Sequence, residues 1–408
     1  MTGHRDIQLF IGSTAFFTLA SRALAVVIGF QIYKITHSPL SLGWLGLVEA
    51  VPAISLVLIG GWVADHHSRR RILLITRTAS LVCALTLALL SLKSTQANLL
   101  GLYSVIFLAG IARAFADPAS TAFEAQVVPQ HLTVNAASWI SSSWISCSVI
   151  GPAVIGFVFD VTGAWGCYLL IALWFLLSWG CTFLIAPKPQ PVISHQEPMT
   201  QSITLGWKFV FGHQALTAAL ALDLFAVLFG GMIALLPVFA QDILHVGARG
   251  LGLLNAAPSL GALIVMLYAT RHPPIERAGR NLLLTVAAFG VSVLIFAFST
   301  NFLLSLLALF FSGVFDGVSM VIRRSMVRLL SPDHMRGRIS AVSWIFICAS
   351  NELGAFESGM LAGLIGTVPC VGVGGLITLV VVATAALWAP QLRRLRFDPH
   401  TLKHTSTP

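Results

Sequence analysis

Hydrophobic residues fill long, nearly uncharged runs along the chain, and short polar segments separate these runs. Each run has about 20 residues, the length that a helix needs to cross a hydrocarbon core of about 30 Å. Twelve such runs occur, at approximately 9–33, 40–62, 72–92, 99–122, 136–158, 165–186, 215–240, 250–270, 281–299, 302–324, 339–362 and 371–389. The first run is too long for a cleaved signal peptide, and no small-residue cleavage site follows it. The pattern predicts an all-α membrane protein with twelve transmembrane helices.

The second half of the chain repeats features of the first. At an offset of 206 residues, LGLVEAVP (45–52) returns as LGLLNAAP (251–258). At an offset of 203 residues three pairs align: Gly110 with Gly313, Pro129 with Pro332, and His131 with His334. Six spans return the chain to the same side of the membrane, so the two repeats are parallel. We therefore expect two pseudo-symmetric six-helix bundles, an architecture of secondary transporters in which the substrate site lies between the halves.

The repeat divides the chain into four parts. The N-terminal six-helix bundle is expected at 1–186 and the C-terminal bundle at 213–390. Between them, 187–212 is Pro-rich and polar at first and then short and amphipathic, which predicts a cytoplasmic tether rather than a domain. Residues 391–408 form a basic cytoplasmic tail.

Composition and charge support membrane insertion. The chain is 57% hydrophobic and 10% charged, and its mean hydropathy of +0.88 is beyond that of soluble domains. With a cytoplasmic N-terminus, 19 of the 24 Lys and Arg residues, Arg77 and Arg323 included, belong to the cytoplasmic side. Only Lys34, Lys93 and Arg249 fall outside, and Arg22 and Arg113 lie within spans. This asymmetry follows the positive-inside rule. The net charge of +9 therefore indicates topology, with both termini cytoplasmic and lipid headgroups as its counter-charge, and not nucleic-acid binding.

Motifs for enzymatic chemistry are absent from the sequence. No HExxH, CxxC or GxxxxGK[ST] pattern occurs, and no soluble segment is large enough to house an ATPase. We therefore expect no enzyme activity, no catalytic residues, no cofactor and no metal site.

The segment GGWVADHHSRRRILL (60–74), between the second and third runs, resembles the signature loop of the major facilitator superfamily. Gly61, Asp65, Arg69 and Arg70 occupy the matching positions. The match is partial, because positions 66 and 68 carry His and Ser where the family usually has Arg and Gly. The resemblance implies a latch between the halves, with Gly61 allowing two helices to approach closely. The alternative is a basic cytoplasmic turn without a gating role.

Other segments narrow the resemblance. YKITHSPLSLGWLGLVEAVP (33–52) and SPDHMRGRISAVSWIFICASNELGAFESG (331–359) look like the bacterial subgroup that includes the enterobactin exporter. This similarity implies a multi-pass protein of the bacterial inner membrane. In the fifth run, Gly151, Pro152 and Gly156 resemble the Gly-Pro motif of exporters in the superfamily. The motif favours export, although a packing pair without directional meaning is the alternative.

Charged residues at membrane depth are the candidates for transport chemistry, because burying a charge there costs about 2.5–3.5 kcal/mol even on insertion scales. Arg113 and Asp117 are four residues apart, so they share a helix face and can pair. Glu49 aligns with Asn255 in the repeat, which leaves a titratable group in one half only. The candidates for proton coupling or substrate binding are Asp223, Asp316, Glu49, Arg22, Arg113, Asp117, Glu352 and Glu357.

Asp223 and Asp316 lead as coupling groups, because they lie deep in their spans without an Arg on the same helix turn. Glu49 is the next candidate, and a salt bridge with Arg22 is its structural alternative. Arg22 and Arg113 are expected to act as charge partners of the acids or as ligands of an anionic substrate. A structural hydrogen bond is the competing explanation for each acid. The sequence favours a monomeric, proton-coupled exporter of a small organic molecule, a siderophore or an amphipathic drug. A lipid or lysolipid flippase and a non-transporting membrane scaffold are the alternatives.

Overall fold

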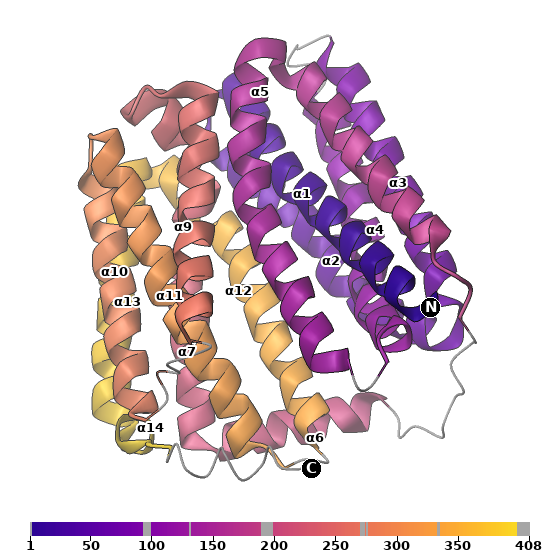
Figure 1. The fold of residues 1–408 in the computed structure, drawn as a ribbon. Helices are drawn as coiled ribbons and strands as arrows, with labels where there is room; N and C mark the ends of the chain where they lie inside the picture. Colours follow the sequence, from indigo (N-terminus) through magenta and orange to yellow (C-terminus); the bar gives the residue numbers. More distant parts are fainter. Residues whose placement is uncertain are drawn as a thin grey trace. The chain divides into compact units, whose positions relative to one another are not determined.

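The computed structural model describes residues 2–92, 99–129, 132–188, 199–269, 274, 276–332 and 335–397. Within these ranges the chain folds into helices joined by loops, with no strand (Figure 1). The α-helices are α1 (Thr2–Thr36), α2 (Pro39–His66), α3 (Arg69–Ser91), α4 (Leu99–Val127), α5 (Thr133–Leu184), α6 (Met199–Gly212), α7 (Gln214–Phe229), α8 (Leu236–Val238), α9 (Gly247–Ala269), α10 (Ala278–Phe298), α11 (Phe302–Leu330), α12 (Arg336–Ile365), α13 (Thr367–Trp388) and α14 (Pro390–Arg394). A 3₁₀ turn, η3 (Met232–Leu235), and a π-helical turn, η4 (Phe239–Ile243), flank α8.

Ten helical stretches among the described residues are long and apolar enough to cross a membrane. One of them, α5, has 52 residues and contains two helices that meet at Gly163, where the chain reverses (Figure 1). Counting α5 twice and adding the 30-residue α12 gives the twelve crossings that the sequence predicts. The predicted run at 215–240 is one crossing built from α7, η3, α8 and η4.

Two compact units make up the chain. Unit 1 contains Met1–Ser194 together with Ala234–Ala256, and unit 2 contains His195–Ile233 together with Ala257–Pro408. The division predicted from the repeat keeps 234–256 in the C-terminal bundle, whereas these residues pack in unit 1. Some sequence predictions lie outside the described residues: Lys93, His131, linker residues 189–198, Arg271, His334 and tail residues 398–408.

In each unit, the segment that matches at offset 206 packs against the segment that matches at offset 203. In unit 1, a Cβ added to Gly110 on α4 would lie 2.7 Å from the Pro52 ring on α2. In unit 2, a Cβ added to Gly313 on α11 would lie 1.9 Å from the carbonyl oxygen of Pro258 on α9. Each glycine therefore lets a helix pack directly against a proline-containing helix. The segments that match at offsets 206 and 203 are packing partners.

A further pair at the 203 offset forms the turns between spans. Gly163 within α5 has φ 67°, and Gly366 between α12 and α13 has φ 90°. A side chain at such φ values is strained, so glycine suits both reversals. The two halves therefore repeat not only residue types but also the positive φ of the glycine at this turn.

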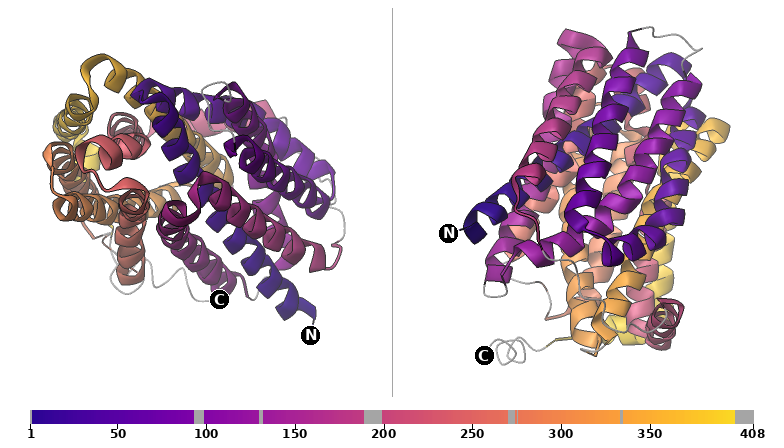
Figure 2. Two further views of the ribbon diagram at one scale, coloured as in Figure 1. Left: turned by 90° about the horizontal axis from the view of Figure 1, so that it is seen from above. Right: turned by 90° about the vertical axis from the view of Figure 1, so that its right-hand side faces the viewer.

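Unit 1 packs α1 against α5, α2 against α4, and α3 between α4 and α5. Unit 2 packs α10 against α11 and α13, and α7 against α12 and α13. Helix α6 lies crosswise at the ends of α7 and α12, as Figures 1 and 2 show. It buries Val210 against Leu216 and Ile339. This short helix corresponds to the amphipathic segment expected at 203–211.

Candidate functional site

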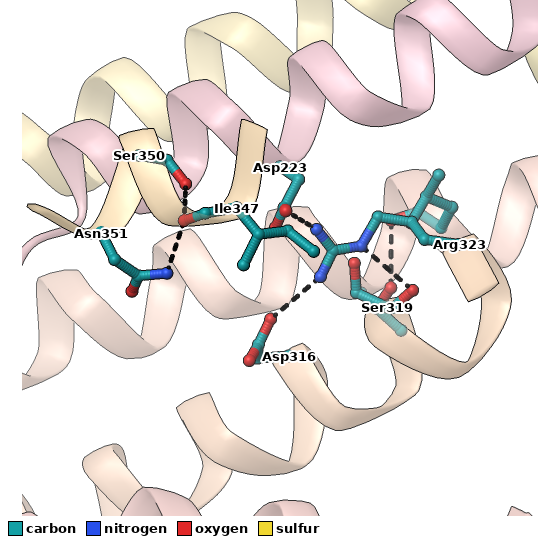
Figure 3. Close-up of polar contacts among 9 residues, drawn as sticks. Asp223, Asp316, Ser319, Arg323, Ile347, Ser350 and Asn351 are labelled. Carbon is teal, nitrogen blue, oxygen red and sulfur yellow. Dashed lines mark hydrogen bonds and ion pairs between the residues drawn. The ribbon is translucent and has the colours of Figure 1, made fainter. Parts of the chain in front are cut away.

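Unit 2 contains a cluster of two carboxylates that share one guanidinium. Arg323 on α11 forms an ion pair with Asp223 on α7, and its Nη2 lies 3.5 Å from Asp316 Oδ1 (Figure 3). Its Nε donates to the Ser319 carbonyl oxygen at 3.4 Å. The Asp223 and Arg323 side chains are only 7% and 10% exposed, whereas the Asp316 side chain is 47% exposed. Asp223 is therefore enclosed by the protein, whereas the side chain of Asp316 is partly exposed.

The helix period explains why Arg323 reaches Asp316. Seven residues make almost two full turns, so both side chains lie on the same face of α11. Asp223 comes from another helix, and its partner is therefore set by the packing of α7 against α11. Sequence spacing therefore predicts the pair of Arg323 with Asp316 but not the pair of Arg323 with Asp223.

A small cavity lies beside this cluster. It has a volume of about 10 Å³, roughly the space of one water molecule, and is bordered by α7, α10 and α11. Its lining residues are Asp223, Ala226, Val227, Val286, Phe289, Phe315, Asp316 and Ser319. Both carboxylates thus border the same cavity, which is otherwise largely apolar and aromatic.

Unit 1 contains a second cluster of two acids and one arginine, and it is more open. Arg113 Nη1 on α4 donates to Glu49 Oε1 on α2 at 2.7 Å, and Arg113 Nε lies 3.6 Å from Asp117 Oδ2. All three side chains are between 35% and 47% exposed. The spacing argument for Arg113 and Asp117 agrees with this geometry. Glu49, for which the sequence suggests Arg22 as a salt-bridge partner, pairs with Arg113.

Arg22 lies on α1 against an aromatic ring. Its guanidinium carbon is 5.3 Å from the centre of the Trp144 ring on α5, a cation–π contact. Gly151 supports this position, because a Cβ added there would lie 3.6 Å from the Arg22 Cβ and 2.9 Å from the Leu19 carbonyl oxygen. Both Arg22 and Trp144 are exposed on unit 1.

The two acids of α12 have different surroundings. Glu357 Oε2 accepts a 3.4 Å hydrogen bond from the Ser358 hydroxyl, and both Glu352 and Glu357 are half-buried. Near Glu352, the side chains of Ser350 and Asn351 bond the Ile347 carbonyl oxygen at 3.0 and 2.8 Å (Figure 3). Glu357 therefore has a polar neighbour on its own helix turn, and the turn before Glu352 is bonded to the helix backbone.

The signature loop places its basic residues against helix ends. Arg69 lies 3.8 Å from Asp65 and donates to the carbonyl oxygens of Ala64 at 3.2 Å and Ala122 at 2.9 Å. Arg70 donates to the Phe183 carbonyl oxygen at 2.5 Å and stacks on the ring of that residue. These contacts tie α3 to the ends of α2, α4 and α5.

The close approach expected at Gly61 occurs at its neighbour. A Cβ added to Gly61 would have nothing within 4 Å, whereas one added to Gly60 would lie 2.3 Å from the Ala114 carbonyl oxygen. The expectation for Gly61 is therefore wrong. Adjacent helix positions point about 100° apart, and it is Gly60 that faces α4.

The Gly-Pro motif of α5 packs against two helices. Gly151 faces α1, while a Cβ added to Gly156 would lie 2.7 Å from the Ala248 carbonyl oxygen on α9. A Cβ added to Gly252 would in turn lie 2.5 Å from the Pro152 carbonyl oxygen. The motif therefore removes side-chain bulk where α5 meets both partners.

Two buried arginines were counted from the sequence as cytoplasmic charges. Arg323 is one, and Arg77 on α3 is the other, with 2% of its surface exposed. Arg77 Nη1 donates to the hydroxyls of Ser13 and Thr182. Both were missed because they lie near the cytoplasmic ends of the runs at 72–92 and 302–324, where positive charges were assigned to the cytoplasmic side. The two-turn spacing of Arg323 from Asp316 was the one available signal.

A two-unit bundle of apolar helices, built from a repeat and carrying ionisable side chains at membrane depth, defines a secondary transporter. A family model described as Major Facilitator Superfamily matches residues 10–278, more than half of the chain. The chain belongs to the Major Facilitator Superfamily, and it is a transporter rather than an enzyme.

Relatives and solved structures agree with this class. The enterobactin exporters EntS of Shigella flexneri and Citrobacter koseri are each 24% identical over 380 residues, which cover 92% of this chain and 90% of theirs. A POT family transporter in complex with 5-aminolevulinic acid matches with a TM-score of 0.76 at 12% identity, over 95% of this chain and 96% of its own. A D-xylose-proton symporter matches with a TM-score of 0.75 at 14% identity, over 97% and 100%. These structures establish the fold.

Proposed function

We propose that this secondary transporter exports a small organic molecule in exchange for protons, by alternating access. The observation that carries the proposal is the Asp223–Arg323–Asp316 cluster in unit 2, in which two acids compete for one buried guanidinium. The resemblance to enterobactin exporters supports export and a siderophore or amphipathic drug as the substrate class.

Competition for Arg323 supplies a coupling mechanism. The exposed Asp316 takes up a proton and loses its attraction to Arg323, which then pairs with Asp223 alone. Deprotonation of Asp316 restores the shared pairing. Each proton thus changes the charge balance between α7 and α11, because a neutral acid no longer attracts the guanidinium. Movement of these helices relative to each other is how the proton would bias the transport cycle.

The open cluster of unit 1 provides the proposed substrate contacts. Glu49, Arg113 and Asp117 are half-exposed at membrane depth, and Arg22 presents a cation beside the Trp144 ring. Charges of both signs next to an aromatic ring suit an amphipathic molecule with polar groups.

Proteoliposomes with an imposed pH gradient test the proposal. We expect Asp223→Asn and Asp316→Asn to abolish gradient-driven export while substrate exchange continues, because exchange requires no net proton movement. Asp160→Asn is a control, since Asp160 belongs to unit 1, is partly exposed like Asp316 and pairs with an arginine of its own, Arg249. Screening siderophores, drugs and lysolipids in the same vesicles identifies the substrate.

Two results would overturn the proposal. Wild-type export by the Asp223, Asp316 and Glu49→Gln variants under a gradient would remove the coupling role from these acids and point to a uniporter or to Glu352 and Glu357. Transport of lysolipids alone would indicate a flippase.

A further inference from the structure

Five arginines gather at one end of unit 2, and we refer to them as the basic patch. Arg277 and Arg280 stand at the start of α10, and the other three lie on and just after α14: Arg393, Arg394 and Arg396. All five side chains are exposed. Among the described residues none of the five has an ion pair or a side-chain hydrogen bond, although exposed Glu276 adjoins Arg277. Within the part of the chain that the structure describes, the patch thus carries five positive charges beside the single carboxylate of Glu276.

Close packing holds the two parts of the patch together. A Cβ added to Gly279 on α10 would lie only 1.6 Å from the Leu392 carbonyl oxygen, and the Gly279 amide donates to the Leu395 carbonyl oxygen at 3.3 Å. Leu392 is fully buried, and Leu395 and Phe397 pack on the same core. The apolar side of this segment is thus occupied by the protein. Its arginines are left to face outward.

The residues that precede α14 mark the membrane level. Trp388, the last residue of α13, is 80% exposed, and Leu387 before it is almost as exposed. Exposed tryptophans are typical of the membrane–water interface, where the ring sits at headgroup level. Arg393 follows Trp388 by five residues. The basic patch therefore lies at the depth of the lipid phosphates.

Apolar surface for acyl chains continues from the patch. Leu284 and Val291 are exposed along α10, and Leu376 and Val380 are exposed along α13, which packs against α10. Figure 1 shows α14 at the shared end of these two helices. A phospholipid can therefore place its chains on this apolar surface and its headgroup against the arginines.

We propose that the basic patch is a binding site for anionic phospholipid, with the lipid phosphates held by Arg393, Arg394, Arg396 and the two arginines of α10. Guanidinium groups bind phosphate oxygens in a bidentate manner, and basic clusters next to membrane helices attract anionic headgroups. The site is independent of the proton-coupling acids. It would tie the end of α13 to the membrane surface.

Binding of phosphatidylglycerol to the full-length protein tests this. The triple variant R393Q/R394Q/R396Q should bind a fluorescent phosphatidylglycerol at least about tenfold more weakly in phosphatidylcholine nanodiscs, given the attraction of about 1 kcal/mol per basic residue near a charged surface. The matched control R393K/R394K/R396K retains the charges and should bind within about threefold of wild type, because lysine also binds phosphate as a point charge. Equal thermal stability of all three proteins in phosphatidylcholine alone confirms that the variants fold.

Leu392→Ala supplies an independent test, because it loosens the docking of the segment while keeping every arginine. It should also weaken phosphatidylglycerol binding. Unchanged lipid binding by the triple glutamine variant would overturn the proposal. Displacement of the lipid by millimolar inorganic phosphate would likewise overturn it and indicate a site for a soluble anion.

Discussion

Gly156 on α5 and Gly252 on α9 lie in contact through their backbones, and a Cβ added to either would come within 3.0 Å of the Cα of the other. Gly252 belongs to the second sequence repeat, yet it packs in unit 1. Nearby, Arg249 Nε lies 2.8 Å from Asp160 Oδ2. The exporter-like motif therefore has a defined partner helix, and this contact admits no side chain from either side.

Replacing Gly252 with Ala is expected to lower stability. The added methyl group would meet the Pro152 carbonyl oxygen at 2.5 Å, and overpacking of this kind typically costs about 1–3 kcal/mol. Thermal unfolding in detergent measures the effect. Gly180→Ala on α5 is the control, because a Cβ there meets nothing within 4 Å. A Gly252→Ala protein as stable as the control would show that the helices separate at no cost.

Gly60 and Gly61 should respond differently to the same substitution. Gly60→Ala would place a methyl group 2.3 Å from the Ala114 carbonyl oxygen, so we expect a lower melting temperature and less transport. Gly61→Ala meets open space and should be neutral or slightly stabilising, because Ala favours a helix over Gly. If Gly61→Ala were the more damaging change, the importance of that position would lie in gating rather than in packing.

Replacing Arg77 with Gln should affect folding and not coupling. The substitution removes the cation that bonds Ser13 and Thr182 in the interior, and buried hydrogen-bonding groups left without partners cost about 1–3 kcal/mol. We expect export and exchange to fall in proportion to the amount of folded protein. Arg323→Gln provides the contrast, since it should lower gradient-driven export more than exchange. Equal loss of both activities in the two variants would assign Arg323 a structural role.

The ion pair between Asp160 and Arg249 should contribute little to stability. Both side chains are at least one-third exposed, and pairs of this kind are worth about 0–1 kcal/mol and weaken with salt. Asp160→Asn should therefore lower the melting temperature slightly in low salt, with no difference at 1 M salt. A large loss that D160R/R249D restores would instead identify a strong pair, held in place by the surrounding helices.

The sequence predicts the helical crossings well because the hydrocarbon core imposes a fixed length on each apolar run. It also predicts the pairing of Arg113 with Asp117, since one helix positions both residues. The contact between Pro52 and Gly110 shows the limit of this reasoning. Each residue was found through the repeat, but their packing against each other depends on how α2 crosses α4.

Charges near helix ends are harder to assign from sequence. Arg323 lies at the end of the apolar run 302–324, and the positive-inside rule counts it as a cytoplasmic charge. Its burial depends on Asp223, which is 100 residues away in the chain and is brought close only by helix packing. Gly61 illustrates a similar problem at finer scale, because a motif match identifies a loop but not which of two adjacent glycines faces the neighbouring helix.

The placement of residues 234–256 in unit 1 has a consequence for the order of folding during synthesis. The ribosome completes α1 long before it makes Asp242, whose carboxylate accepts the hydrogen bond of the buried Tyr33 hydroxyl. Domains generally fold in the order of their synthesis, but unit 1 lacks one of its segments until residue 256 has been made. The first repeat therefore completes its packing only after part of the second has entered the membrane.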